Sequence, residues 1–259
     1  MRTATSVLTT TSADGTTIAF DRVGDGPVIV LSPGALCDRT SFAGVADVLA
    51  SSFTVVNYDR RGRGDSGDTE PYAIERKVED LAAVIAANGG AATNVVGHSS
   101  GAMLGLEAAA AGHPMAGLVA YEPPYVSRFN PALIGEVRAH VADGRPDLAV
   151  EAFILETGMP AEFLPLARQL PMWPTMLACA STLWHDLTIL GDGEVPVERM
   201  SRIAVPTLVV DGGESAEEMH VGAMTLAGVV PRARMLTVAG QGHDIALDVL
   251  AGVLADDFA

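Results

Sequence analysis

Short apolar runs alternate with longer segments of mixed polarity along most of this chain. The runs are rich in β-branched residues and fall at Val28–Leu31, Phe53–Tyr58, Thr93–Val96 and Leu118–Tyr121. Such runs are typical of strands buried on both faces of a parallel sheet. Segments of helical length lie between them, at Ser41–Leu49, Ile74–Ala87 and Ser100–Ala111. The alternation predicts an α/β fold with a mostly parallel central sheet flanked by helices.

The two ends of the chain extend this pattern. Val7–Thr11 and Thr17–Asp21 flank Asp14-Gly15, which predicts an opening hairpin. Two further strands and a closing helix are predicted at Thr207–Val210, Met235–Val238 and Ile245–Phe258.

One long stretch in the middle breaks the alternation. From Pro124 to Met200 the chain has a helical pattern, interrupted by stops that contain glycine and proline. This stretch predicts a helical insertion of residues 124–200 in a core domain formed by residues 1–123 and 201–259.

Composition and charge narrow the class of protein. The 259 residues are 49% hydrophobic and 19% charged, as in compact globular proteins. A formal net charge of −16 repels nucleic-acid phosphates and anionic lipid, so we expect neither as a partner. Cys37 and Cys179 lie far apart without metal-ligand spacing, which favours free thiols in a reducing compartment. With no signal-peptide pattern and no membrane-length apolar run, we expect a cytoplasmic protein of undetermined oligomeric state.

The segment Gly97-His98-Ser99-Ser100-Gly101 carries the clearest chemical signal. It follows the run that ends at Val96 and precedes a small-residue helical stretch. A strand, a Gly-x-Ser-x-Gly turn and a helix form a nucleophile elbow, in which the two glycines leave room for a sharp turn. Ser99 is therefore the candidate nucleophile; the alternative is an ordinary turn.

Together with the elbow, the segment Asp59-Arg60-Arg61-Gly62-Arg63-Gly64-Asp65-Ser66 makes the chain resemble the α/β-hydrolase superfamily. The segment is similar to the family's Asp-x-Arg-Gly-x-Gly-x-Ser loop, which is mainly structural, although its arginines could form an anion site. The resemblance covers nearly the whole chain. It implies an α/β-hydrolase fold with a helical cap inserted after the sixth strand, where residues 124–200 fall.

The resemblance also implies a base and an oxyanion hole. His243 follows the last predicted strand, where the family places its catalytic histidine. We expect His98 to pack beside the elbow. The backbone N–H groups of Ala35 and Ser100 correspond to the oxyanion hole. The usual His-Gly of the first loop is replaced by Pro33-Gly34, which leaves open what supports this loop.

The acid that should orient His243 departs from the common pattern, because Ser215 stands where the family usually has its carboxylate. Glu122 ends the sixth predicted strand, and some relatives take their acid from this position. We expect Pro123 to hold Glu122 in an extended conformation. Glu214 and Asp211 are the alternative acids. Glu122 is preferred because strand carboxyl ends form the ligand crevice of such sheets.

These residues predict a serine hydrolase that cleaves a small or medium, largely apolar ester, thioester or lactone through an acyl-enzyme. Trp173, Met176 and Trp184 of the insertion are the candidate substrate-binding residues, and His185 either packs or contacts substrate. The expected partner is a small-molecule substrate, and no cofactor or metal is expected. Two alternatives stay open: a carbon–carbon bond hydrolase or cofactor-free perhydrolase on the same triad, and a non-catalytic or weakly catalytic ligand-binding protein of the same fold.

Overall fold

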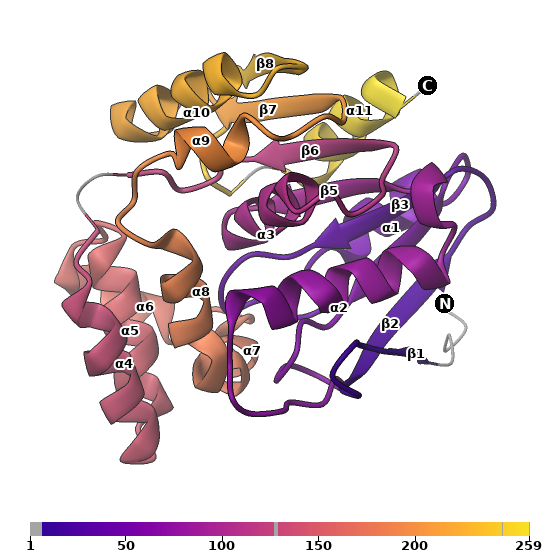
Figure 1. Cartoon of the computed structure of the whole chain (residues 1–259). Coiled ribbons are helices and arrows are strands. Elements are labelled where there is room, and N and C mark those ends of the chain that lie inside the picture. The colour runs from indigo at the N-terminus through magenta and orange to yellow at the C-terminus, as the bar shows by residue number, and fades with distance from the viewer. Residues whose placement is uncertain (1–6, 127–128, 245, 259) are drawn as a thin grey trace.

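The computed structural model describes residues 7–126, 129–244 and 246–258 and contains one mixed sheet with helices on both faces (Figure 1). The strands run in the order β1-β2-β4-β3-β5-β6-β7-β8. The pairs β1–β2 and β2–β4 are antiparallel, and every other pair is parallel. The strands are β1 Leu8–Thr11, β2 Thr17–Val23, β3 Val28–Ser32, β4 Thr54–Tyr58, β5 Asn94–His98, β6 Gly117–Tyr121, β7 Thr207–Gly212 and β8 Ala233–Val238.

The central strands are apolar throughout because both faces of the sheet are covered. In β3, Val30 joins the core under α2, α3 and α10, whereas Ile29 and Leu31 join the core under α1 and α11. Neighbouring side chains of a strand point to opposite faces, so each strand contributes to both cores. The covering helices are α1 Ala43–Leu49, α2 Ile74–Ala87, α3 Ser100–Ala110, α10 Glu217–Val229 and α11 Leu247–Phe258, with the 3₁₀ turn η1 at Gly90–Ala92.

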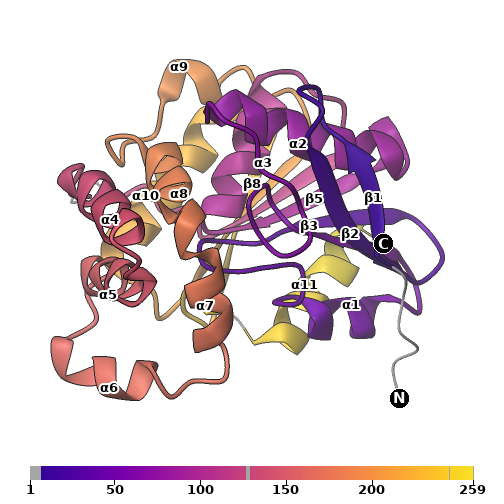
Figure 2. The same cartoon turned by 90° about the horizontal axis from the view of Figure 1, so that it is seen from below.

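Between β6 and β7 the chain forms the insertion predicted as helical. Its elements are α4 Ala132–Ala142, α5 Pro146–Glu156, η2 Ala161–Phe163, α6 Leu164–Ala167, α7 Trp173–Cys179, η3 Ala180–Thr182, α8 Leu183–Leu190 and α9 Val197–Met200. The helices α4 to α8 gather to one side of the sheet (Figures 1 and 2) and share their own apolar core, which includes Val137, Val150 and Leu183. The last helix differs, because Met200 is buried in the core beneath α3 and α10.

Most predicted elements are present, with shifted ends. The strand predicted to end at Val96 continues to His98, because Gly97 and His98 pair with Ala120 and Tyr121 of β6. The predicted helices from Ser41 and Ile245 begin at α1 Ala43 and α11 Leu247. Residues 1–6 of the opening segment and Ile245 lie outside the described residues. No helix in the described part of the chain is long and apolar enough to cross a membrane.

The glycines that flank the turn after β5 fit tightly, as the elbow predicts. A Cβ on Gly97 would overlap the backbone of Gly101 and Ala102, and a Cβ on Gly101 would overlap the carbonyl oxygens of Ser32 and Pro33. The start of α3 therefore packs directly against the end of β3.

We expect Gly101→Ala to destabilise the protein by at least about 1–3 kcal/mol, because rigid backbone surrounds the added methyl group. Gly135→Ala is the matched control. Gly135 lies inside α4 with open space around its Cα, so alanine there should stabilise by about 0.5–1 kcal/mol. Urea unfolding of both variants measures the difference, and equal free energies of unfolding would contradict the packing argument.

Candidate active site

Three strained residues mark the carboxyl ends of the adjacent strands β3, β5 and β6. Among the described residues, the non-glycine residues with positive φ are Leu36 (56°), Ser99 (54°) and Glu122 (49°). Ser99 and Glu122 directly follow β5 and β6, and Leu36 lies in the loop after β3. Such conformations cost of order 1–3 kcal/mol each and persist where the surrounding structure enforces them, which is common at functional sites.

Ser99 stands at the turn between β5 and α3, as the sequence predicts. Its N–H donates to Tyr121 O (2.9 Å), and its own carbonyl accepts from Ala102 N (2.9 Å) and Met103 N (3.2 Å) at the start of α3. These bonds hold the strained turn, which places the Ser99 side chain on the wall of a cavity beneath the insertion.

A carboxylate and an imidazole meet at the same cavity. His243 Nδ1 donates to Glu122 Oε2 (3.1 Å), and Gly212 N donates to Glu122 Oε1 (2.7 Å). Burial alone would raise the pKa of Glu122, but the hydrogen bonds from His243 and Gly212 outweigh it and lower the pKa below its ordinary value. Glu122 therefore remains charged beside the His243 ring and accepts its Nδ1–H.

Ser99 and His243 line the same cavity, and the imidazole side chain is 44% exposed. No hydrogen bond joins Ser99 Oγ to His243 within the described residues. In unliganded enzymes such catalytic contacts are often long and shorten when substrate binds.

The extended conformation expected for Glu122 is wrong. Its φ of 49° lies in the left-handed region, although Pro123 follows it. The backbone N–H of Glu122 donates to Val210 O (2.8 Å), and its carboxylate holds Gly212 and His243. These three contacts on both sides of the residue outweigh the local preference set by the proline.

The two alternative acids do not reach the imidazole. The carboxylate of Asp211 accepts a hydrogen bond from His220 Nδ1, on α10. Glu214 lines the cavity as an exposed side chain, and its backbone N–H donates to Gln241 O (2.8 Å). Among the three sequence candidates, the structure therefore places only Glu122 against His243.

The candidate oxyanion donors, Ala35 and Ser100, lie on the wall of the same cavity. Neither backbone N–H donates a hydrogen bond to another described residue. Two buried arginines support the loop where Pro33-Gly34 replaces the usual His-Gly. Arg60 Nη1 donates to Pro33 O (3.1 Å), and Arg63 Nη1 donates to Gly34 O (2.7 Å). The arginines of the Asp59–Ser66 segment thus have a structural role.

Side chains from β5 and β6 hold the segment that carries His243. Tyr121 Oη donates to Gly242 O, and His98 Nε2 donates to His243 O (2.9 Å). The carbonyl can only accept, so Nε2 of His98 carries a proton. Burial, followed by the nearby His243, lowers the pKa of His98 from 6.5 to about 4. His98 therefore packs beside the elbow and also fixes the backbone of His243.

The sequence and the fold have counterparts among known proteins. The sequence pattern of the Alpha/beta hydrolase family matches residues 29–255. The chain belongs to the alpha/beta hydrolase family. The crystal structure of an alpha/beta hydrolase from Sphaerobacter thermophilus DSM 20745 is similar, with 46% identity, a TM-score of 0.92, and coverage of 97% of this chain and 100% of that one. The protein is thus an enzyme of the alpha/beta hydrolase class.

Two other proteins are similar to this chain over a shorter stretch or at lower identity. The uncharacterized hydrolase YraK of Bacillus subtilis (strain 168) is 37% identical over 101 residues, which span 38% of this chain and 37% of YraK. The esterase RhEst1 from Rhodococcus sp. ECU1013 has 19% identity and a TM-score of 0.76, with 97% of this chain and 98% of that chain covered. At this identity, RhEst1 supports the hydrolase fold alone.

The cavity of this alpha/beta hydrolase has a volume of about 440 Å³ and an apolar roof. The apolar lining residues include Val126, Phe129, Phe153, Leu187, Leu190 and Met219. Trp173, Met176 and Trp184, the predicted substrate-binding residues, are not among the described residues that line this cavity. Trp173 and Met176 pack in the core of the insertion, and Trp184 packs edge-on against Tyr72. Apolar helices predict which residues are buried, but not which of their faces meets the sheet.

The site includes a residue that the sequence does not single out. Asp186 of α8 is 1% exposed at the base of the cavity and accepts hydrogen bonds from Ser100 Oγ (2.9 Å) and Arg63 Nη2. The only local signal is its place beside His185. His185 is buried and stacks on the Tyr72 ring, which supports the packing alternative for this histidine.

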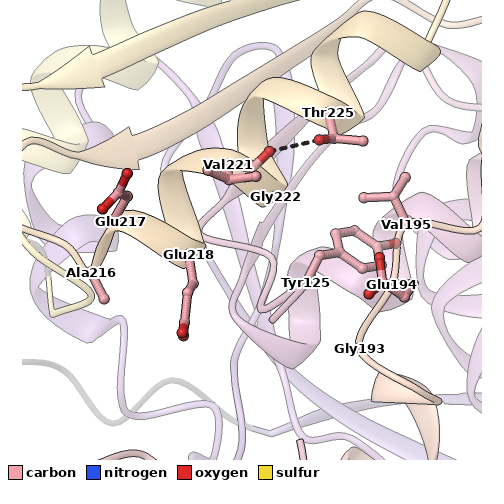
Figure 3. A pocket seen from close by; sticks show the side chains of 10 residues that line it. All are labelled: Tyr125, Gly193, Glu194, Val195, Ala216, Glu217, Glu218, Val221, Gly222 and Thr225. Carbon is pink, nitrogen blue, oxygen red and sulfur yellow. Dashed lines mark hydrogen bonds between the residues drawn. The ribbon is translucent and has the colours of Figure 1, made fainter. Parts of the chain in front are cut away.

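A second cavity of about 470 Å³ lies between Tyr125, the segment 193–195 and α10 (Figure 3). The only hydroxyls among its described lining residues are those of Tyr125 and Thr225, and Thr225 Oγ1 donates to Val221 O (2.8 Å). The described lining offers neither histidine nor cysteine, so this cavity lacks the groups for acyl transfer. Within the described residues, no three His, Cys, Asp or Glu side chains gather as a metal site.

The low pKa of His98 links stability to pH. The native state favours the neutral ring, so its stabilising effect is complete above the unfolded pKa of 6.5 and is lost as the pH falls towards 4. Because the ring keeps some solvent contact, we expect the wild type to lose about 1–3 kcal/mol more than His98→Gln over this interval. Urea unfolding of both proteins between pH 7 and pH 4.5 measures it. Parallel stability curves would contradict the assignment.

Proposed function

We propose that this alpha/beta hydrolase is a serine hydrolase that forms an acyl-enzyme at Ser99. The observation that carries the proposal is the Glu122–His243 hydrogen bond (3.1 Å) on the wall of the cavity that Ser99 also lines. With Nδ1 donating to the carboxylate, Nε2 is available to accept the Ser99 proton. Ser99 Oγ then attacks a carbonyl carbon, and His243 returns the proton to the leaving group.

The N–H groups of Ala35 and Ser100 supply the oxyanion hole in this proposal. Ser100 is the first residue of α3, so its N–H carries the partial positive charge of a helix N-terminus. Donors fixed before the reaction stabilise the negative charge that develops on the carbonyl oxygen. The two residues line the cavity on the same wall as Ser99.

The substrate that fits the proposal is a small or medium, largely apolar ester, thioester or lactone. A cavity of about 440 Å³ holds a molecule of this size, and Phe129, Phe153 and Leu187 offer apolar contacts. The side chains of Glu156 and Glu214 also line the cavity. These carboxylates would repel an acid group on the substrate, so the neutral ester is favoured over a half-ester of a dicarboxylic acid.

The first test is labelling with a fluorophosphonate probe followed by mass spectrometry of the peptides. We expect one adduct, on Ser99, because an activated serine loses its proton and attacks the phosphorus, which releases fluoride. The Ser99→Ala variant is the control and should stay unlabelled. An inert wild type, or an adduct on another residue such as Cys37, would contradict the proposal.

A second test separates the acid from its alternatives. Glu122→Gln keeps the shape of the side chain but removes the charge that fixes the tautomer of His243. We expect it to lower kcat for p-nitrophenyl butyrate by about 10³- to 10⁴-fold. Glu214→Gln is the matched control, since it removes a carboxylate from the same cavity, and should change kcat by less than about tenfold. Equal losses in the two variants would reassign the acid.

A further inference from the structure

Two buried arginines hold the backbone on both sides of the candidate oxyanion hole. Arg60 Nη1 donates to Pro33 O (3.1 Å) and to Ser100 Oγ (2.9 Å). Arg63 Nη1 donates to Gly34 O (2.7 Å) and Cys37 O (2.9 Å), which flank Ala35. The positions of both N–H donors therefore depend on where these two guanidinium groups lie.

A single carboxylate from the insertion holds both guanidinium groups. Asp186 Oδ1 lies 2.8 Å from Arg60 Nη1 and Oδ2 pairs with Arg63 Nη2. Oδ1 also accepts the Ser100 hydroxyl (2.9 Å). Burial opposes the charge on Asp186, but Arg60 and Arg63 hold its pKa below the usual range. The charged Asp186 carboxylate thus contacts Ser100 directly and reaches the loop after β3 through the two arginines.

We propose that Asp186 is a positioning residue that sets the geometry of the oxyanion hole from within the insertion. This inference rests on the proposed function, because it assigns Ala35 and Ser100 as oxyanion donors. Such donors act only when they are held close to the position of the developing charge. In this proposal, the packing of α8 on the core also positions the two N–H donors of the oxyanion hole.

A neighbouring contact distinguishes positioning from simple attachment of the insertion. Tyr72 Oη donates to His185 O (3.1 Å), one residue before Asp186. This bond also joins α8 to the core, but it touches neither Ser100 nor the loop after β3. Tyr72→Phe removes the bond and keeps the ring that stacks on His185, so it is the matched control for Asp186→Asn.

The test compares kcat and KM for p-nitrophenyl butyrate with the affinity for a trifluoromethyl ketone, whose adduct with serine carries an oxyanion. In Asp186→Asn we expect kcat to fall about 10- to 100-fold. Removal of a whole oxyanion-hole donor lowers kcat by about 10²- to 10³-fold, so a misplaced donor should cost less or about the same. The affinity for the ketone should fall by a similar factor. KM and the affinity for the corresponding non-hydrolysable ether should stay within about twofold, since both report ground-state binding. Tyr72→Phe should change none of these values by more than about twofold.

A second variant covers the case in which Asp186→Asn does not fold. Ser100→Ala keeps the backbone N–H and the ion pairs but removes the hydroxyl that contacts Asp186. We expect kcat and ketone affinity to fall together by about 3- to 10-fold. Unchanged ketone affinity in the folded variants, a change confined to KM, or equal losses in Tyr72→Phe would overturn the proposal.

Hydrogen exchange keeps the two proposals separable. If Asp186 positions the oxyanion hole, the hydrogen-bonded amides of Ala102 and Met103, which hold the turn around Ser100, exchange faster in Asp186→Asn and in Ser100→Ala, but not in Tyr72→Phe. If the wild type labels at Ser99 but exchange in the variants equals that in the wild type, the positioning role is rejected and the serine hydrolase is kept. If exchange is faster in the variants but the wild type does not label at Ser99, the positioning role is kept and the hydrolytic mechanism is rejected.

Discussion

The site depends on backbone strain that hydrogen bonds of the sheet hold in place. Ser99 and Glu122 take positive φ directly after adjacent parallel strands. The N–H of Ser99 donates to Tyr121 O (2.9 Å), and the N–H of Glu122 donates to Val210 O (2.8 Å). Each strained residue thus extends the hydrogen bonding of the neighbouring strand, which offsets the cost of its conformation. The side chains of Ser99 and Glu122 therefore lie just beyond the ends of β5 and β6, at the edge of the sheet that the insertion covers.

Buried charge imposes a second constraint on the same edge. Arg60, Arg61 and Arg63 are each at most 1% exposed, although the chain is strongly acidic. Taking a guanidinium group out of water costs several kcal/mol unless a carboxylate accepts its hydrogen bonds. Asp80 accepts two from Arg61, and Asp186 is shared by Arg60 and Arg63. Displacement of α8 would leave two buried cations without their partner, so the insertion and the core are bound by more than apolar contact.

The sequence predicts the parts of the site that are local or that follow strand order. Gly97 and Gly101 predict the turn at Ser99 because the steric demand acts over five residues. The resemblance to the family points to His243 and Glu122, and the meeting of the carboxyl ends of parallel strands at one edge supports Glu122. The contact between Ser100 and Asp186 joins residues 86 positions apart, and it depends on how α8 rotates against the core. An apolar helix pattern leaves that rotation open, and in the same way it leaves open whether Trp173 and Trp184 face the cavity.

The position of the acid shows what the site requires of the fold. In the register of the sheet, Tyr121 of β6 lies opposite Val210 of β7, so Glu122 is level with Asp211. Asp211 bonds to His220 on α10, away from the imidazole, whereas the strained backbone of Glu122 brings its carboxylate to Gly212 N and His243 Nδ1. Side chains alternate along a strand, and at the position of Asp211 the side chain points to the face that α10 covers. In the proposed mechanism His243 needs one anionic oxygen at a fixed point, and either of two paired strands can supply it from just beyond its end. Ser215 can therefore stand at the family's usual acid position, because the neighbouring strand already places a charge behind the imidazole.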